Sequence, residues 1–213
     1  MTIKRLSWFL LIIVLAIIIG LYPAIYYMFD MHNKGLLQTK PAALFKNEVW
    51  HLLFYTHITF GAFAMLFGWP QFVANFRNRN LRAHRFIGKI YLLSVLLSGV
   101  AGLYIAYYAS GGLISQIGFG FLAVAWLFTG LNAYRSILKL DIIAHQNWMV
   151  RNYSLTFAAV TLRIWLPLLQ FAFHFDFFFA YPIVAWLCWI PNLLVAELLI
   201  YRLNLNRAFS FRD

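Results

Sequence analysis

The sequence is poor in acidic residues and nearly lacks cysteine. Six acidic residues stand against 17 lysines and arginines, and Cys188 is the single cysteine among 213 residues. One cysteine excludes an internal disulfide and CxxC redox chemistry. Only 11% of the residues are charged, whereas soluble domains carry about 25%. Disorder is excluded as well, because disordered chains are weakly hydrophobic and 63% of this chain is apolar.

Several enzyme signatures are also missing. The chain has no HExxH, no glycine-rich phosphate loop, no GxSxG and no carboxylate run suited to two metals. The net charge of +11 would point to nucleic acid in a soluble protein. Here the basic residues form short clusters between long apolar runs, which bilayer topology explains better. The sequence therefore indicates an integral membrane protein without a nucleic-acid partner.

Six apolar stretches are long enough to cross a bilayer. A spanning helix needs about 20 mostly apolar residues, and the stretches that qualify are 6–29, 49–75, 86–108, 116–138, 148–173 and 180–203. Strand alternation is absent, and the runs are too long for barrel strands. We therefore expect an all-α fold, a polytopic integral membrane helix bundle of six transmembrane helices over 1–213. The basic run Lys4–Arg5 resembles the start of a signal peptide, but without a cleavage pattern we expect a retained helix.

The basic residues predict the orientation of the bundle. Most of them fall in the amino-terminal segment, the second-to-third and fourth-to-fifth connections, and the carboxy-terminal tail. Because cytoplasmic loops are enriched in lysine and arginine, both termini are predicted to be cytoplasmic.

Polar residues of the fifth span recur with helical spacing. Projected at about 100° per residue, one face carries His145, Asn152, Thr156, Ala159, Arg163, Gln170 and His174. Polar side chains in lipid face the protein interior, so this face is expected to point into the bundle. Arg163 has no acidic residue at its depth. The Arg163 charge is therefore expected to be stabilised by an anionic ligand group, such as a carboxylate, or by backbone carbonyls.

Two histidines are predicted to lie at equal depth on the cytoplasmic side. His84 begins the third span, with Gly88 on its face, and His145 begins the fifth. Two histidines on different helices can ligate a b-type haem iron, and the neighbouring Arg82, Arg85 and Arg151 would suit its propionates. The alternative is that interfacial histidines contact lipid headgroups. The small residues beside them either allow close helix packing or leave room for a flat cofactor.

A second polar group is predicted toward the outer side. His57 and His174 lie there, at or near the depth of Arg163. Together with His51 and Asp176, these histidines could form a diffuse copper or zinc site.

Several motifs resemble an uncharacterised bacterial membrane family, domain of unknown function 2306. The motifs are His57 through Arg85 and Gly88, His145-Gln-Asn-Trp148-Met149-x-Arg151, Thr156-Phe-Ala-Ala, Leu162-Arg163 and Ala185-Trp186-Leu-Cys-Trp189-Ile-Pro191-Asn192. The resemblance covers most of the chain from the second span onward. It implies a multi-span protein of the bacterial inner membrane and carries no established activity.

The order of His57, small residues, a basic loop, His84 and Gly88 is remotely similar to the ascorbate-reducible transmembrane b cytochromes. That similarity implies a four-helix core, formed here by the second to fifth spans, with histidines paired between alternate helices, which would join His84 to His145. The outer pair departs from the pattern, because the fourth span contains no histidine. Either His174 of the fifth span supplies the second outer haem ligand, or the outer site is not a haem site. A quinone or another small ligand near His57 and Arg163 is then conceivable.

Three functional hypotheses follow from these patterns. The first is a haem-binding protein that transfers electrons within the membrane, with a quinone or a redox protein as partner. The second is a cofactor-free assembly or partner protein whose polar face serves helix packing. The third is a binder or transporter of a small anionic or lipidic molecule through the Arg163 face.

Overall fold

The computed structural model describes residues 3–29 and 35–210, and the side chains within 7–29 and 35–205. All regular elements in these ranges are helices. The longer helices are α1 (Ile3–Leu21), α3 (Glu48–Gly68), α5 (Leu81–Tyr107), α6 (Leu113–Leu138), α7 (Ile142–Thr156), α8 (Ala158–Ala172), α9 (Phe177–Leu187) and α10 (Ile190–Ser210). Short elements link them: α2 (Ile25–Met28), α4 (Ala74–Arg79), and the 3-10 turns η1 (Tyr22–Ala24), η2 (Gly35–Thr39), η3 (Ala42–Lys46) and η4 (Trp69–Phe72).

The all-helical fold class and the six spans are confirmed. Six stretches of helix are long and apolar enough to cross a membrane: Ser7–Met28, Glu48–Phe72, Leu81–Tyr107, Leu113–Leu138, Ile142–Ala172 and Phe177–Leu205. The third and fifth begin several residues before the predicted positions 86 and 148. Side-chain caps explain the difference, because Asn80 accepts a hydrogen bond from Ala83 N at 3.0 Å and Asp141 accepts one from Ala144 N at 2.9 Å. Apolar composition marks the membrane core, whereas a cap marks the start of the helix.

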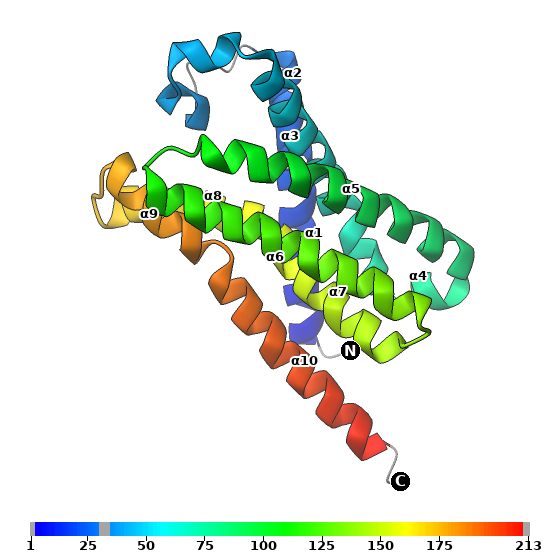
Figure 1. The fold of residues 1–213 in the computed structure, drawn as a ribbon. Helices are drawn as coiled ribbons and strands as arrows, with labels where there is room; N and C mark the ends of the chain where they lie inside the picture. Colours follow the sequence, from blue (N-terminus) through cyan, green and yellow to red (C-terminus); the bar gives the residue numbers. More distant parts are fainter. Residues whose placement is uncertain (1–2, 30–34, 211–213) are drawn as a thin grey trace.

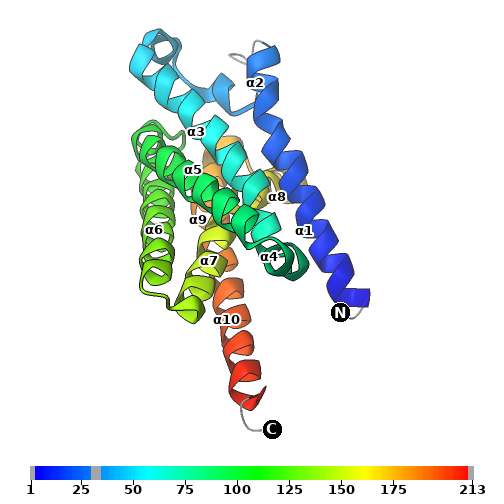
Figure 2. The same ribbon diagram turned by 90° about the vertical axis from the view of Figure 1, so that its right-hand side faces the viewer.

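The predicted four-helix core is also present. Helix α5 packs along both α3 and α6, α6 packs along α7, and α7 closes the bundle against α3. Helices α5 and α7 are therefore diagonal to each other (Figure 2). Helix α1 packs on the outside of this core against α3 and, less extensively, α8. Helix α10 docks on α7 and then projects beyond the core (Figure 1).

Most described basic side chains lie at one end of the bundle, which we call the basic end. It contains α4, the start of α5, the α6–α7 connection and the far end of α10 (Figures 1 and 2). The basic residues at the two chain termini lie outside the described side chains. The opposite end is covered by η2 and η3, where Lys40 Nζ donates a hydrogen bond to the Tyr108 carbonyl. Burial lowers the pKa of Lys40 to about 8.

The fifth span is not one continuous helix. It divides at Phe157, where a turn joins α7 to α8, and Val160 N bonds Phe157 O in an i to i+3 pattern at 2.9 Å. Such a tight turn shifts the helical phase. The polar face expected to run unbroken from His145 to His174 is therefore split into two parts, one on α7 and one beginning on α8.

Close helix packing accounts for several of the small residues. A Cβ atom at Gly68 would lie 2.3 Å from the Tyr153 ring, and one at Gly102 would lie 3.1 Å from His57 Nδ1. Gly88 differs, since the nearest atom to a Cβ there is Gln71 Oε1 at 3.5 Å. The packing interpretation thus holds for Gly68 and Gly102, whereas a Cβ at Gly88 would make only an ordinary van der Waals contact.

We expect Gly68→Ala to destabilise the protein by about 1–3 kcal/mol, because an added methyl group must displace a buried tyrosine ring. Thermal unfolding in detergent should show a clearly lowered Tm. Gly120→Ala is the matched control, since no atom lies within 4 Å of a Cβ at that position. Equal melting temperatures for the two variants would contradict the packing argument.

Candidate functional site

His84 and His145 occupy equivalent positions at the basic end. Each follows its helix cap by four residues, with His84 N bonded to Asn80 O and His145 N bonded to Asp141 O, both at 3.0 Å. The two imidazoles thus stand in the first turns of diagonal helices that run in the same direction. Their charges are close enough to interact. Both partly buried imidazoles therefore lie at the basic end, near enough for an electrostatic interaction.

The hydrogen bonds of these two rings differ. His145 Nδ1 lies 2.9 Å from the Ala133 carbonyl of α6. A carbonyl only accepts, so Nδ1 is the donor, and in a neutral ring Nε2 keeps a free lone pair. His84 Nδ1 is buried and has no hydrogen-bond partner among the described residues. Orphaned buried polar atoms are rare and call for an explanation.

A second orphaned group lies close to His84 along α5. Gln71, in η4, is buried, and its Nε2 atom has no hydrogen-bond partner within the described part of the chain. Its Oε1 faces Gly88, one helical turn beyond His84. Sequence reasoning missed Gln71, although a glutamine that follows Trp69-Pro70 in an apolar run was a usable signal. His84, Gly88 and Gln71 together form a polar region with unmet hydrogen bonds.

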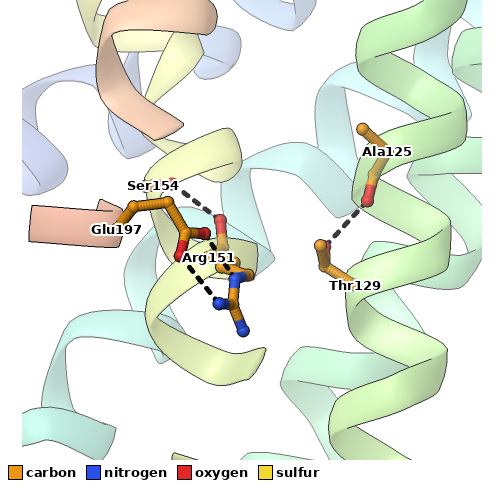
Figure 3. Close-up of polar contacts among 5 residues, drawn as sticks. All are labelled: Ala125, Thr129, Arg151, Ser154 and Glu197. Carbon is orange, nitrogen blue, oxygen red and sulfur yellow. Dashed lines mark hydrogen bonds and ion pairs between the residues drawn. The ribbon is translucent and has the colours of Figure 1, made fainter. Parts of the chain in front are cut away.

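Arginines near this region are in two different situations. Arg85 is exposed, and its charge and that of Arg77 reach His84. Arg151 is already engaged by Glu197 of α10, with Nε to Oε1 at 2.5 Å and Nη2 to Oε2 at 2.8 Å (Figure 3). It also stacks 4.7 Å over the Trp148 ring. Arg82 and Arg85 are thus freer than Arg151 to meet a ligand carboxylate.

A saturated hydrogen-bond network closes the bundle interior beyond the histidine pair. Tyr91 donates to Asn152 Oδ1 at 2.5 Å and lies 3.0 Å from Thr156 Oγ1, to which Trp126 Nε1 also donates at 2.9 Å. Asn152 Nδ2 reaches Trp126 O at 2.7 Å and Thr129 Oγ1 at 2.8 Å. Thr129 in turn donates to its own helix at Ala125 (Figure 3). Tyr91 and Asn152 each follow their histidine by seven residues, about 10 Å along the helix, so the candidate site is confined to the basic end.

The outer histidines are not held together by any described interaction. His57 Nδ1 lies 2.9 Å from the Ser98 carbonyl, and Ser98 Oγ donates back to His57 O at 2.8 Å, which ties α3 to α5. His174 is exposed and follows α8 in a left-handed conformation (φ 54°). In the described ranges, no three His, Cys, Asp or Glu side chains gather closely enough to hold a metal ion. The diffuse copper or zinc set is therefore not assembled.

The Arg163 side chain makes a hydrogen bond and a cation–π contact. Its Nη1 donates to Ala159 O at 2.8 Å, and its guanidinium lies 4.5 Å from the Tyr22 ring centre. The backbone carbonyl anticipated as one counterpart is thus present. The Tyr22 ring was not anticipated, because it belongs to α1–η1, far away in sequence. Gln170, predicted on the same face, is half-buried farther along α8.

These features define the class of the protein: it is an integral membrane protein of six spanning helices built around a four-helix core. Residues 54–200 match the family described as predicted membrane protein DUF2306. The match covers more than half of the chain, and the chain belongs to this family. No curated protein and no solved structure matches the chain. The similarity to transmembrane b cytochromes stays a prediction.

Proposed function

We propose that this protein binds one b-type haem between His84 and His145 and transfers electrons within the bacterial inner membrane. One observation supports the proposal above all: the imidazoles of His84 and His145 stand in the first turns of two diagonal helices, with their charges close enough to interact. One ring is tethered through Nδ1, and the other has an orphaned Nδ1. A bound haem iron supplies one-electron redox chemistry, which no side chain of this site can supply.

The residues present fit such a group. A histidine that ligates a metal commonly donates its other ring N–H to a carbonyl, which fixes the tautomer and orients the free nitrogen. His145 makes this bond to Ala133 O. Gly88, one turn beyond His84, is not in tight contact with its neighbours, and the exposed Arg82 and Arg85 can pair with carboxylates. The Tyr91–Asn152 network limits how far any group can reach into the core.

The absorption spectrum of the full-length protein, purified from haem-replete cells, tests this function. We expect a Soret band and sharp bands after reduction. Electron exchange with a quinone or a redox protein would then appear as reoxidation of the reduced bands. Colourless protein from such cells would overturn the proposal.

A cofactor-free assembly role is the second candidate. The observation that favours it is the network in which Asn152 and Thr156 of α7 form hydrogen bonds with residues of α5 and α6. Purification of the protein in a larger complex, with function retained after replacement of His57, His84 and His145, would support this role over electron transfer.

The basic end is expected to face the cytoplasm, because basic loops are retained there. Cys188 is fully buried, so the native cysteine is not expected to react with a maleimide, and the labelling of an introduced cysteine can be measured by itself. A membrane-impermeant maleimide added to intact cells, with the outer membrane opened, should label Lys46→Cys and spare Lys139→Cys until the inner membrane is lysed. Both lysines are exposed, at opposite ends of the bundle. The reverse labelling pattern would contradict the predicted orientation.

A further inference from the structure

Arg163 carries a charge inside a membrane span. It lies nine residues before the end of α8, about 14 Å from that end at 1.5 Å per residue. Arginines near a helix end usually extend toward the membrane surface. Arg163 instead turns back along α8, toward the basic end, to reach Ala159 O at 2.8 Å. Its guanidinium is therefore kept within the bundle.

Most of the hydrogen-bonding capacity of Arg163 is unused. A guanidinium has five N–H donors, and the described residues accept from one of them, at Ala159 O. Among the described side chains, an ion pair joins Arg151 to Glu197. No carboxylate of the described residues forms an ion pair with Arg163. The Tyr22 ring offsets part of the charge through a cation–π contact. An uncompensated cation within a membrane remains costly.

Phenol and imidazole side chains lie near this cation. Tyr181 is only 7% exposed, and among the described residues its hydroxyl has no hydrogen-bond partner. Tyr181, Tyr22 and Tyr26 all interact electrostatically with Arg163. His57, nine residues after the start of α3, also interacts electrostatically with Arg163, and its Nδ1 is hydrogen-bonded to Ser98 O. The cluster thus offers a guanidinium and phenol hydroxyls but no anion.

We propose that the cluster of Arg163, Tyr181, Tyr22 and His57 is a binding site for the oxyanion, carboxylate or phosphate, of an acidic amphiphile drawn from the bilayer. A planar guanidinium can bind either a carboxylate or a phosphate through two parallel hydrogen bonds. The Tyr181 hydroxyl adds a third donor. The depth of Arg163 favours an amphiphile over a water-soluble anion, because an apolar chain stabilises the ligand at that level. This site is separate from the histidine pair at the basic end.

Ligand-induced thermal stabilisation of the full-length protein in neutral detergent tests the proposal. Dodecanoate and dodecyl phosphate present the two oxyanions on the same chain, dodecanol presents the chain alone, and acetate and inorganic phosphate present the anions alone. We expect a concentration-dependent rise in Tm with one or both acidic amphiphiles and none with the other three. Dodecanoate alone would identify a fatty-acid carboxylate, and dodecyl phosphate alone a phospholipid phosphate.

Variants then assign the effect to the cluster. Arg163→Gln should weaken the binding of the acidic amphiphile at least tenfold, and Tyr181→Phe, which removes only the unpartnered hydroxyl, should weaken it several-fold. Tyr181→Phe keeps the test valid if Arg163→Gln does not fold. Arg79→Gln, an exposed arginine at the basic end, is the matched control and should bind normally. Equal stabilisation by dodecanol or inorganic phosphate, or undiminished binding in Tyr181→Phe and Arg163→Gln, would overturn the proposal.

Discussion

Substitution of His145 or His84 by alanine is expected to remove the haem absorbance of the purified protein. Each variant would remove one of the two histidines proposed to hold the haem, so we expect the Soret absorbance per protein to fall at least tenfold. His51→Ala is the matched control, because His51 also lies four residues after an asparagine cap, Asn47, but at the opposite end of the bundle. The Soret band of His51→Ala should equal that of the unaltered protein.

Rescue by added imidazole separates a ligand role from a structural role. His145→Ala removes the hydrogen bond to Ala133 O as well as a ring nitrogen, so a loss of colour alone could reflect a disturbed α6–α7 contact. Free imidazole would take the place of a missing haem-binding histidine side chain but cannot restore a folded helix pair. Recovery of the reduced bands in imidazole is expected for both variants. Full haem retention in either variant without imidazole would contradict the assignment of that histidine.

The largest effect on stability is expected for Asn152→Ala. The amide of Asn152 accepts from Tyr91 and donates to Trp126 O and Thr129 Oγ1, all in a buried network. Leaving buried polar groups unsatisfied costs about 1–3 kcal/mol each, so we expect a loss of about 3 kcal/mol. For a chain of this size, that loss corresponds to a fall in Tm of about 6–12 °C.

Asn132→Ala is the matched control for that variant. The Asn132 side chain bonds only Phe128 O of its own helix, at 2.8 Å, so its removal should leave Tm nearly unchanged. If the two asparagine variants unfold at the same temperature, the network does not hold the core together.

The parts of this structure that were predictable depend on local sequence. The length of an apolar run determines whether a helix can span a bilayer, so the six spans followed from composition, whereas the four-helix core was implied by the cytochrome resemblance. The equal level of His84 and His145 was predictable for the same reason, since each stands at the start of its span. The exact helix starts were misjudged because Asn80 and Asp141 cap polar first turns. Those two caps were visible in the sequence.

The parts that were not predictable depend on tertiary contacts. The division of the fifth span occurs at Phe157, where neither glycine nor proline marks a break. Arg151 is paired with Glu197, 46 residues away in sequence, and Arg163 stacks on Tyr22 of a different span. Helical periodicity locates a side chain on a face, but it does not identify the neighbour across from that face. Partner assignments of this kind need the packed structure.

The haem content of the purified protein tests the central claim most directly. Determined as the pyridine haemochrome and divided by the amount of protein, it is predicted to be one b-type haem per chain, held between His84 and His145 at the basic end. A protein with intact fold and no haem, after growth in haem-replete cells, would contradict that claim.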